Sequence, residues 1–375
     1  MTLILFILML GLLISIHEAG HMLVAKMFNM YVREYSIGFG PVIWKKQGKE
    51  TLYSIRAIPL GGFTGLIESE NDNVAQKYLE GSATEEKDVT EEETEEEPQL
   101  LVDESRTFYG AKPWKRILVL LAGPVANLLL ACIVFVSIFI ANGKDVIYPK
   151  AIIQQVMPQS AAMEAGLQPG DEIVQIRYSN GDVVKVETTY DVSLNNQMHK
   201  GEMTVTVIRN NNSMDVSLTP RYDEESKAYM MGIMFSGQPE YRKLNLVQAI
   251  GRGISFTFET ISLTLKSVAM LITGQVGMES MAGTIGIYSI TKEAVSYGFL
   301  TYLSLVGQIS VSLGIMNLLP VPVFDGGRIL LTLIEMIIGH RLSRKMEDAI
   351  LTVGLVLVLL LFILITVSDI SKLFN

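Results

Sequence analysis

The sequence has 375 residues, 49% of them hydrophobic, and a positive mean hydropathy, a composition that suits a membrane protein carrying a soluble module. The formal net charge of −9 comes from one segment, because residues 68–105 hold fifteen acidic side chains and two lysines and the rest of the chain is net positive. The single cysteine, Cys132, excludes a disulfide within the chain, so any external domain must be held together by its core alone.

Four apolar segments predict membrane-spanning helices. Each approaches the roughly 20 residues that a helix needs to cross about 30 Å of hydrocarbon. The segments are Leu3–Ala25, Ile117–Ala141, Phe299–Leu319 and Ala349–Val367. We therefore expect a polytopic α-helical membrane protein with four transmembrane helices.

The first segment contains His-Glu-Ala-Gly-His at residues 17–21. An ionisable side chain at membrane depth costs roughly 2.5–3.5 kcal/mol on insertion scales and is rarely without a function. Positions i and i+4 share a helix face, so His17 and His21 can hold one metal ion while Glu18 reaches a water bound to it. This pattern indicates a buried zinc hydrolase. The alternatives are a chance match and a signal peptide, but the segment lacks a basic start and an evident cleavage site.

Residues 31–64 predict two strands around a Lys- and Gly-rich turn. Glycines and aromatic residues beside a membrane helix favour a hairpin that dips toward the active site, where non-helical backbone must be covered by protein. An ordinary cytoplasmic hairpin explains these residues equally well.

Residues 68–105 include six glutamates between positions 91 and 97. Like charges repel one another and bury no apolar surface, so we expect a solvated, disordered cytoplasmic insertion. A regulatory tail is the less favoured alternative.

Residues 148–236 predict a compact β-rich domain. A strand at 151–153 precedes a short helix at 160–166, which ends in a glycine. A strand at 172–178 follows, and residues 203–209 and 214–218 alternate like a hairpin around three asparagines.

The apolar segment 244–273 is interrupted every seven residues by Arg252, Glu259 and Lys266. This spacing gives one polar stripe. It favours an amphipathic helix that lies on the membrane or packs along the bundle, rather than a fifth span.

Lysines and arginines near the span ends predict the orientation. Nine lie between the first and second spans or between the third and fourth, against four on the other side. Both termini and residues 142–298 are therefore expected outside the cell, and residues 26–113 and 320–348 in the cytoplasm.

Two histidines leave a catalytic zinc one protein ligand short. His199 and His340 are poor candidates, because the first is external and the second lies in a basic loop, so a carboxylate is expected. Asp325 follows the third span in Pro-Val-Pro-Val-Phe-Asp-Gly-Gly, residues 320–327. Read alone, Asp-Gly-Gly indicates only a turn. The two prolines, however, end the helix and expose backbone polar groups close to membrane depth, where exposure is costly and requires a functional reason.

Three motifs together resemble the bacterial site-2 protease family, the regulated intramembrane zinc metalloproteases of the RseP/RasP type. They are the His-Glu-Ala-Gly-His sequence, Ala122-Gly123-Pro124-x-x-Asn127 in the second span, and Asn317-x-x-Pro-x-Pro-x-x-Asp325-Gly-Gly after the third. Residues 37–41 and 58–62 resemble the family's membrane-associated β-hairpin, and the external domain resembles a single PDZ domain. The acidic segment 68–105 departs from the family pattern.

The resemblance implies that His17, His21 and Asp325 bind zinc and that Glu18 is the catalytic base. It also implies that Asn317 acts near the substrate backbone. Asp325 and His17 then reach the same side of the membrane, which excludes an odd number of additional spans between them. An edge strand from residues 50–64 would hold the unwound substrate by strand addition.

The expected enzyme is a multi-pass cell-membrane zinc endopeptidase with its active site near the cytoplasmic side. It would cleave transmembrane segments of single-span proteins, such as anti-sigma factors, or signal-peptide remnants, after a first cut outside by a site-1 protease. The lipid bilayer is its other partner, and no nucleic acid is expected. The rival functions are a PDZ adaptor that has lost catalysis and a metal or ion transporter.

The resulting domain organisation has six parts. They are the first transmembrane helix and hairpin (1–67), the acidic insertion (68–105), the second transmembrane helix (106–141), the extracytoplasmic PDZ-like domain (148–236), the amphipathic segment (244–298), and the third and fourth transmembrane helices with the Asp-Gly-Gly motif (299–375).

Overall fold

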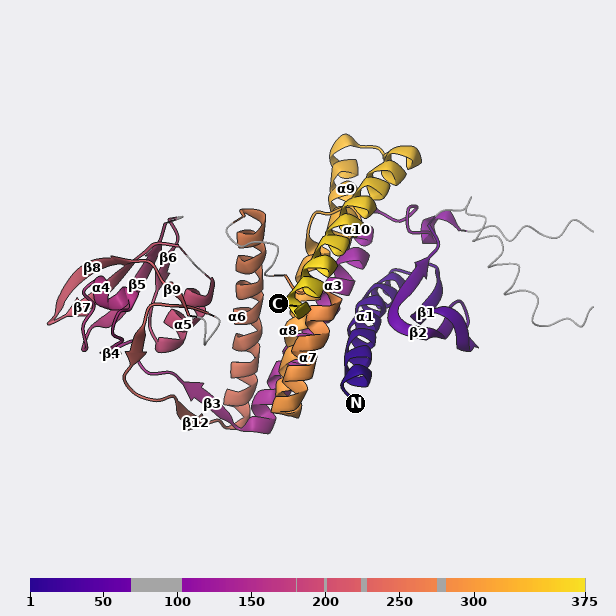
Figure 1. The fold of residues 1–375 in the computed structure, drawn as a ribbon. Coiled ribbons are helices and arrows are strands. Elements are labelled where there is room, and N and C mark those ends of the chain that lie inside the picture. The colour runs from indigo at the N-terminus through magenta and orange to yellow at the C-terminus, as the bar shows by residue number, and fades with distance from the viewer. Residues whose placement is uncertain (69–102, 180, 199–200, 224–227, 275–280, 375) are drawn as a thin grey trace, which may run out of the picture. The chain divides into compact units, whose positions relative to one another are not determined.

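The computed structural model describes residues 1–68, 103–179, 181–198, 201–223, 228–274 and 281–374. Most of the predicted acidic insertion lies outside these residues. The chain forms two compact units (Figure 1). One comprises Met1–Ala141 with Ile250–Asn375, and the other Asn142–Ala249.

The first unit is built mainly of helices. These are α1 (Thr2–Met27), α3 (Pro113–Asn142), α6 (Leu246–Ile272), α7 (Thr284–Tyr297), α8 (Phe299–Leu318), α9 (Asp325–Ile338) and α10 (Arg344–Phe374), with a short 3₁₀ helix, η1 (Glu104–Arg106). Among the described residues, five helices are long and apolar enough to cross a membrane: α1, α3, α6, α8 and most of α10. The prediction of a helical membrane protein with added strands is therefore confirmed.

Helix α6 covers the segment predicted to be amphipathic. It is the least apolar of the five, and its predicted polar stripe contains an ion pair, Arg252 Nη1 to Glu259 Oε1 at 2.7 Å. The helix packs against α3, where the rings of Phe135 and Phe256 meet edge to face at 4.9 Å. Since α6 has the length and composition of a span, the count of four transmembrane helices stays a prediction.

Helices α1 and α8 run in the same direction. Near their starts, the Tyr302 hydroxyl donates to the carbonyl oxygen of Leu5 at 2.9 Å, and near their ends His17 and Asn317 line one cavity. Helix α3 runs opposite to α1, and the two helices are in close contact at Gly20. A Cβ at this position would lie 2.3 Å from the Ala122 carbonyl oxygen. Only glycine permits this approach.

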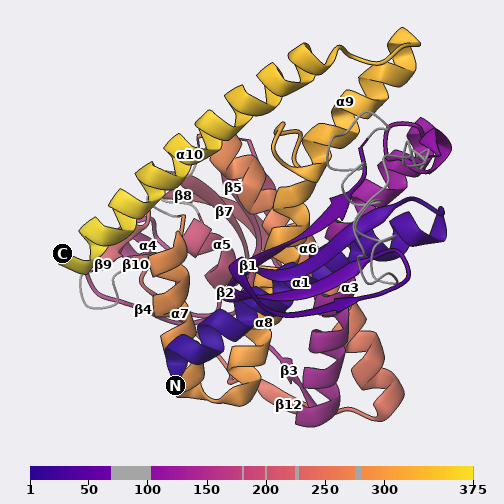
Figure 2. The same ribbon diagram turned by 90° about the vertical axis from the view of Figure 1, so that its right-hand side faces the viewer.

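The strands of the first unit form a long bent hairpin beside α1 (Figure 2). Strand β1 (Val32–Gln47) pairs with two stretches of β2 (Leu52–Leu66), so that Tyr35 lies opposite both Tyr53 and Thr64. The last stretch of β2, residues 62–66, pairs with β1 along one side only within the described chain. That stretch is therefore an edge strand, and its residues 63–66 line the cavity that also contains His17, His21 and Asp325.

A buried ion pair joins α3 to α9. Arg116 binds Glu335, and the two side chains are 3% and 8% exposed. The backbone N–H of Leu342 donates to the other carboxylate oxygen of Glu335 at 3.2 Å. Removing one partner of such a pair is strongly destabilising, whereas replacing both with apolar side chains of similar volume is often neutral or stabilising.

The second unit is a β-rich domain with its own core. Its central sheet has the strand order β6 (Val183–Lys185), β5 (Glu172–Tyr178), β7 (Met203–Arg209), β8 (Asn212–Leu218). Three antiparallel pairs and two helices complete it: β3 (Lys144–Ile147) with β12 (Glu240–Lys243), β4 (Ile153–Val156) with β11 (Ile233–Phe235), β9 (Arg221–Asp223) with β10 (Ala228–Met230), and helices α4 (Ala161–Glu164) and α5 (Thr189–Met198). The predicted short helix and hairpin are confirmed, and the likeness to a PDZ domain stays a prediction.

A buried carboxylate supports this second core. Asp171 accepts hydrogen bonds from Arg209 Nε and Nη2, both at 2.6 Å, and from the Gln168 N–H at 2.8 Å. Burial acts to raise the pKa of Asp171, but the bonds from Arg209 and Gln168 outweigh it and lower the pKa. The resulting stability is present above the unfolded pKa of about 3.9 and is lost as the pH falls through the folded value.

Asp171→Asn should destabilise the second unit by about 3 kcal/mol at pH 7, because it leaves Arg209 without its charge partner. Faster hydrogen exchange of β5 and β7 in the full chain would report the loss. The difference from wild type should shrink at acidic pH, where Asp171 itself becomes protonated. Asp215→Asn, at an exposed side chain of β8, is the control and should change exchange little.

Glu335→Gln should lower the thermal stability of the purified protein by about 3–5 kcal/mol, since it leaves a buried arginine unpaired. The double change Arg116→Met with Glu335→Leu should recover most of that loss. Glu50→Gln breaks the exposed pair with Arg106 and should cost under about 1 kcal/mol. Equal losses for Glu335→Gln and Glu50→Gln would show that the buried pair is energetically unimportant.

Candidate metal centre

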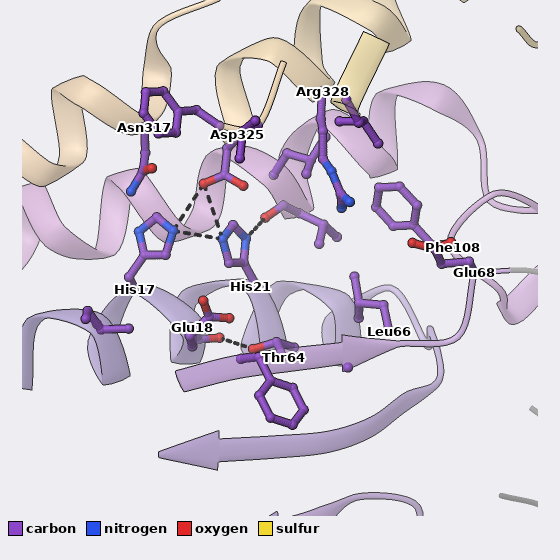
Figure 3. A pocket seen from close by; sticks show the side chains of 18 of the residues that line it. His17, Glu18, His21, Thr64, Leu66, Glu68, Phe108, Asn317, Asp325 and Arg328 are labelled. Carbon is purple, nitrogen blue, oxygen red and sulfur yellow. Dashed lines mark hydrogen bonds and ion pairs between the residues drawn. The ribbon is translucent and has the colours of Figure 1, made fainter. Parts of the chain in front are cut away.

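Three predicted metal ligands lie together in the first unit. His17 and His21 occupy successive turns of α1, and Asp325 is the first residue of α9. Asp325 Oδ2 lies 3.1 Å from His17 Nε2 and 3.4 Å from His21 Nε2, and the two Nε2 atoms are 3.2 Å apart (Figure 3). The structure therefore joins residues that are separated by about three hundred positions in the sequence.

This triangle has the dimensions of a zinc site. Nitrogen and oxygen ligands bind tetrahedral zinc at about 2.0–2.2 Å, so two such ligands lie about 3.3 Å apart. The three separations of 3.1, 3.2 and 3.4 Å match that value. Two imidazoles and one carboxylate also leave a fourth position for water or substrate, which is the arrangement of a catalytic zinc rather than a structural one.

Backbone contacts orient one of the imidazoles. His21 Nδ1 lies 2.7 Å from the carbonyl oxygen of Val119 on α3. A carbonyl can only accept, so Nδ1 carries the proton, and Nε2 presents its lone pair to the triangle when the ring is neutral.

Asp325 is held ionised. Burial acts to raise its pKa, but hydrogen bonds from the imidazoles of His17 and His21, when these rings are protonated, outweigh it and lower the pKa to about 2. A carboxylate that is ionised at neutral pH is a competent metal ligand.

Glycines allow the three segments to converge. A Cβ at Gly123 on α3 would lie 2.3 Å from His21 Nε2 and 2.8 Å from His17 Cε1. A Cβ at Gly326 would lie 2.2 Å from the Leu318 carbonyl oxygen, and one at Gly327 would lie 2.1 Å from that of Val321. Asp-Gly-Gly is thus not a free turn, because it forms the first turn of α9 and packs tightly under the end of α8.

The triangle opens into a cavity of about 890 Å³. Glu18, the predicted base, and Asn317, predicted to act near the substrate backbone, both line it. Figure 3 shows Asn317 and Asp325 on the opposite side of the two imidazoles from Thr64. The cavity walls also include the edge stretch of β2 at residues 63–66 and one face of α10, made of Asp348, Leu351, Thr352 and Leu355.

A hydrogen bond joins strand β2 to α1 at Glu18, the predicted catalytic base. The Thr64 hydroxyl donates to the backbone oxygen of Glu18 at 2.8 Å. A Cβ at Gly62 would lie 3.7 Å from Glu18 Cγ and 2.7 Å from the Ser36 carbonyl oxygen. The predicted hairpin therefore contributes directly to the wall of the cavity.

Sequence reasoning assigned no individual role to Asn127 or Arg328, which also line this cavity. Asn127 is 1% exposed, and its only sequence signal was its place in the Ala-Gly-Pro-x-x-Asn motif. Arg328 lies one turn beyond Asp325 on α9 and projects into the cavity (Figure 3). His340 is exposed and lies outside the cavity, in agreement with its exclusion as a ligand.

Comparison with known proteins gives one family and several full-length relatives. The model of peptidase family M50 matches residues 5–361. The regulator of sigma-W protease RasP of Bacillus subtilis is 30% identical over 425 residues, which cover 100% of this chain and 99% of RasP. The zinc metalloprotease RasP of Oceanobacillus iheyensis is 31% identical over 427 residues, with 100% and 99% coverage.

The predicted family, enzyme class and zinc cofactor are thereby confirmed. The family model spans nearly the whole chain, both units included. The candidate ligand triangle lies in the apolar helical unit, which fits a multi-pass membrane enzyme. The chain belongs to peptidase family M50, the site-2 proteases, and is a zinc metalloendopeptidase.

Proposed function

We propose that this protease cleaves transmembrane segments of single-span membrane proteins, such as anti-sigma factors, or signal-peptide remnants, after a first extracytoplasmic cut by a site-1 protease. The observation that carries the proposal is the triangle of His17, His21 and Asp325 with Glu18 in one cavity bounded by apolar helices. A relative named as the regulator of sigma-W protease supports a regulatory substrate.

His17, His21 and Asp325 hold the zinc ion in this proposal. Bound zinc supplies Lewis acidity, which makes water nucleophilic at neutral pH and polarises a peptide carbonyl. The chain's own contribution is to fix the three ligand atoms and to leave one side of the triangle open toward the cavity.

Glu18 acts as the general base. It takes the proton of the attacking water and returns it to the leaving amine, a role that a positioned carboxylate performs well. Asn317 donates a hydrogen bond from its carboxamide N–H to the substrate backbone, on the side of the imidazoles opposite Thr64. The attachment of Thr64 to the Glu18 backbone keeps the base beside the strand wall.

The edge stretch of β2 binds the substrate by strand addition. A transmembrane helix hides its carbonyls in its own hydrogen bonds and must unwind before attack. Within the described chain, residues 62–66 leave one strand edge unpaired along the cavity, so they can replace the lost bonds of an unwound segment. Exposed apolar side chains at the far end of the hairpin, Ile43 at 70% and Trp44 at 48%, support its association with the membrane.

The proposed topology places both termini and the second unit outside the cell and the metal centre near the cytoplasmic side. The parallel course of α1 and α8 supports it, because both would cross from outside to inside and deliver His17 and Asp325 to one depth. In this topology α6 lies on the membrane or packs along the bundle, because a span at α6 would move Asp325 to the side opposite His17. The second unit is the PDZ-like domain of this proposal.

Glu18→Gln should retain zinc and lower turnover by about 10²–10⁴, because an amide keeps the shape of the side chain but cannot accept the proton. Zinc content of the purified protein and cleavage of tagged single-span proteins in membranes would measure the two effects. Residual turnover above about a tenth of wild type would remove Glu18 from the role of base.

Asp325→Ala should lose both activity and most bound zinc, since two imidazoles leave the ion with too few protein ligands. Asp348→Ala is a matched control, because Asp348 lines the same cavity without belonging to the ligand triangle, and it should keep its zinc. Stoichiometric zinc in Asp325→Ala would place the third ligand elsewhere.

A further inference from the structure

Two buried polar atoms on facing helices lack a hydrogen-bond partner within the described chain. They are Nδ1 of His17 on α1 and Oδ1 of Asn127 on α3. The two residues are 8% and 1% exposed. A buried polar atom without a partner costs roughly 1–3 kcal/mol, so a structure that keeps two of them in one cavity requires an explanation.

The packing of α1 against α3 places these residues at the same level. The two helices are antiparallel, with His21 bonded to Val119 and His17 in contact with Gly123. Asn127 lies one turn beyond Gly123, on the same helix face. Leu13, one turn before His17, belongs to the core cluster against which Leu130 packs, so the two helices stay in register beyond Asn127.

The two atoms are also chemically complementary. A histidine that binds a metal through Nε2 carries its proton on Nδ1 and almost always donates it to an acceptor. His21 donates to the carbonyl of Val119. His17 has no such backbone acceptor in the described chain, whereas Asn127 Oδ1 is an acceptor with no donor.

We propose that Asn127 is the positioning residue of His17, accepting its Nδ1–H at Oδ1, directly or through one bridging water, when zinc is bound. This bond fixes the tautomer and ring angle that aim His17 Nε2 at the ligand triangle. It accounts for an asparagine in the middle of an apolar helix, where a polar side chain is costly. The inference rests on the proposed role of His17 as a zinc ligand.

The asymmetry between the two histidines makes the bond testable. The outer partner of His21 is a backbone carbonyl, which substitution leaves in place, whereas the outer partner of His17 is a side chain. Asn127→Leu removes the acceptor and roughly keeps the volume. Asn127→Asp keeps an acceptor oxygen at the same position.

Zinc affinity of the purified full-length protein, measured by competition with a chelator, is the readout. Asn127→Leu should weaken zinc binding roughly 10–100-fold, the effect typical of losing an outer-shell partner, and Asn127→Asp should remain within about threefold of wild type. Thermal unfolding of the zinc-free proteins checks that the fold is retained. If Asn127→Leu fails to fold, Asn127→Ala takes its place in the same comparison.

Two controls separate the possible failures. Asn317→Leu changes the other asparagine of the cavity and should keep wild-type zinc affinity while losing activity. His17→Ala must lose zinc, and if it does not, the proposed ligand role is wrong independently of Asn127. Wild-type affinity in Asn127→Leu, equal weakening in Asn127→Leu and Asn127→Asp, or weakening in Asn317→Leu alone would each overturn the assignment of Asn127.

Discussion

The structure depends on the close approach of three backbone segments around one point. Helices α1 and α3 and the start of α9 must bring Nε2 and carboxylate atoms to within about 3.3 Å of one another to match a tetrahedral zinc. Side chains larger than hydrogen would block this convergence, which is why glycine occupies positions 20, 123, 326 and 327. The family motifs are thus packing requirements as much as chemical ones, because each places a glycine beside a ligand.

Satisfaction of polar groups in an apolar setting is the second constraint. In hydrocarbon, each unpaired polar group is costly, so membrane proteins satisfy them internally. The paired groups follow this rule: His21 bonds to a backbone carbonyl, Arg116 to Glu335, and Ser310 to the backbone oxygen of Asn127. Two of the exceptions among the described residues, His17 Nδ1 and Asn127 Oδ1, belong to residues that line the cavity at the metal centre.

The cavity combines a helical wall with a strand wall, and the two serve different steps. The helices carry the proposed ligands, His17, His21 and Asp325, and the proposed base, Glu18. In the proposed mechanism, the edge stretch of β2 offers backbone hydrogen bonds to a substrate segment that has lost its own helical bonds. A peptidase that acts on a helix needs both, since a carbonyl is exposed to attack only after unwinding.

The sequence by itself determined the chemistry and the local elements. Two histidines one turn apart in an apolar run indicate a metal site, and apolar runs of about 20 residues predict α1, α3, α8 and α10, because these depend on spacing and composition alone. The sequence identified Asp325 only through the family resemblance. A carboxylate about 300 positions after His17 and His21 carries no local signal that it lies beside them. Tertiary structure alone decided that Asp-Gly-Gly begins a helix rather than a free turn and that residues 62–66 are the edge along the cavity. It alone also placed Asn127 at the level of His17, because the antiparallel packing of α1 on α3 is a long-range property that local periodicity does not encode.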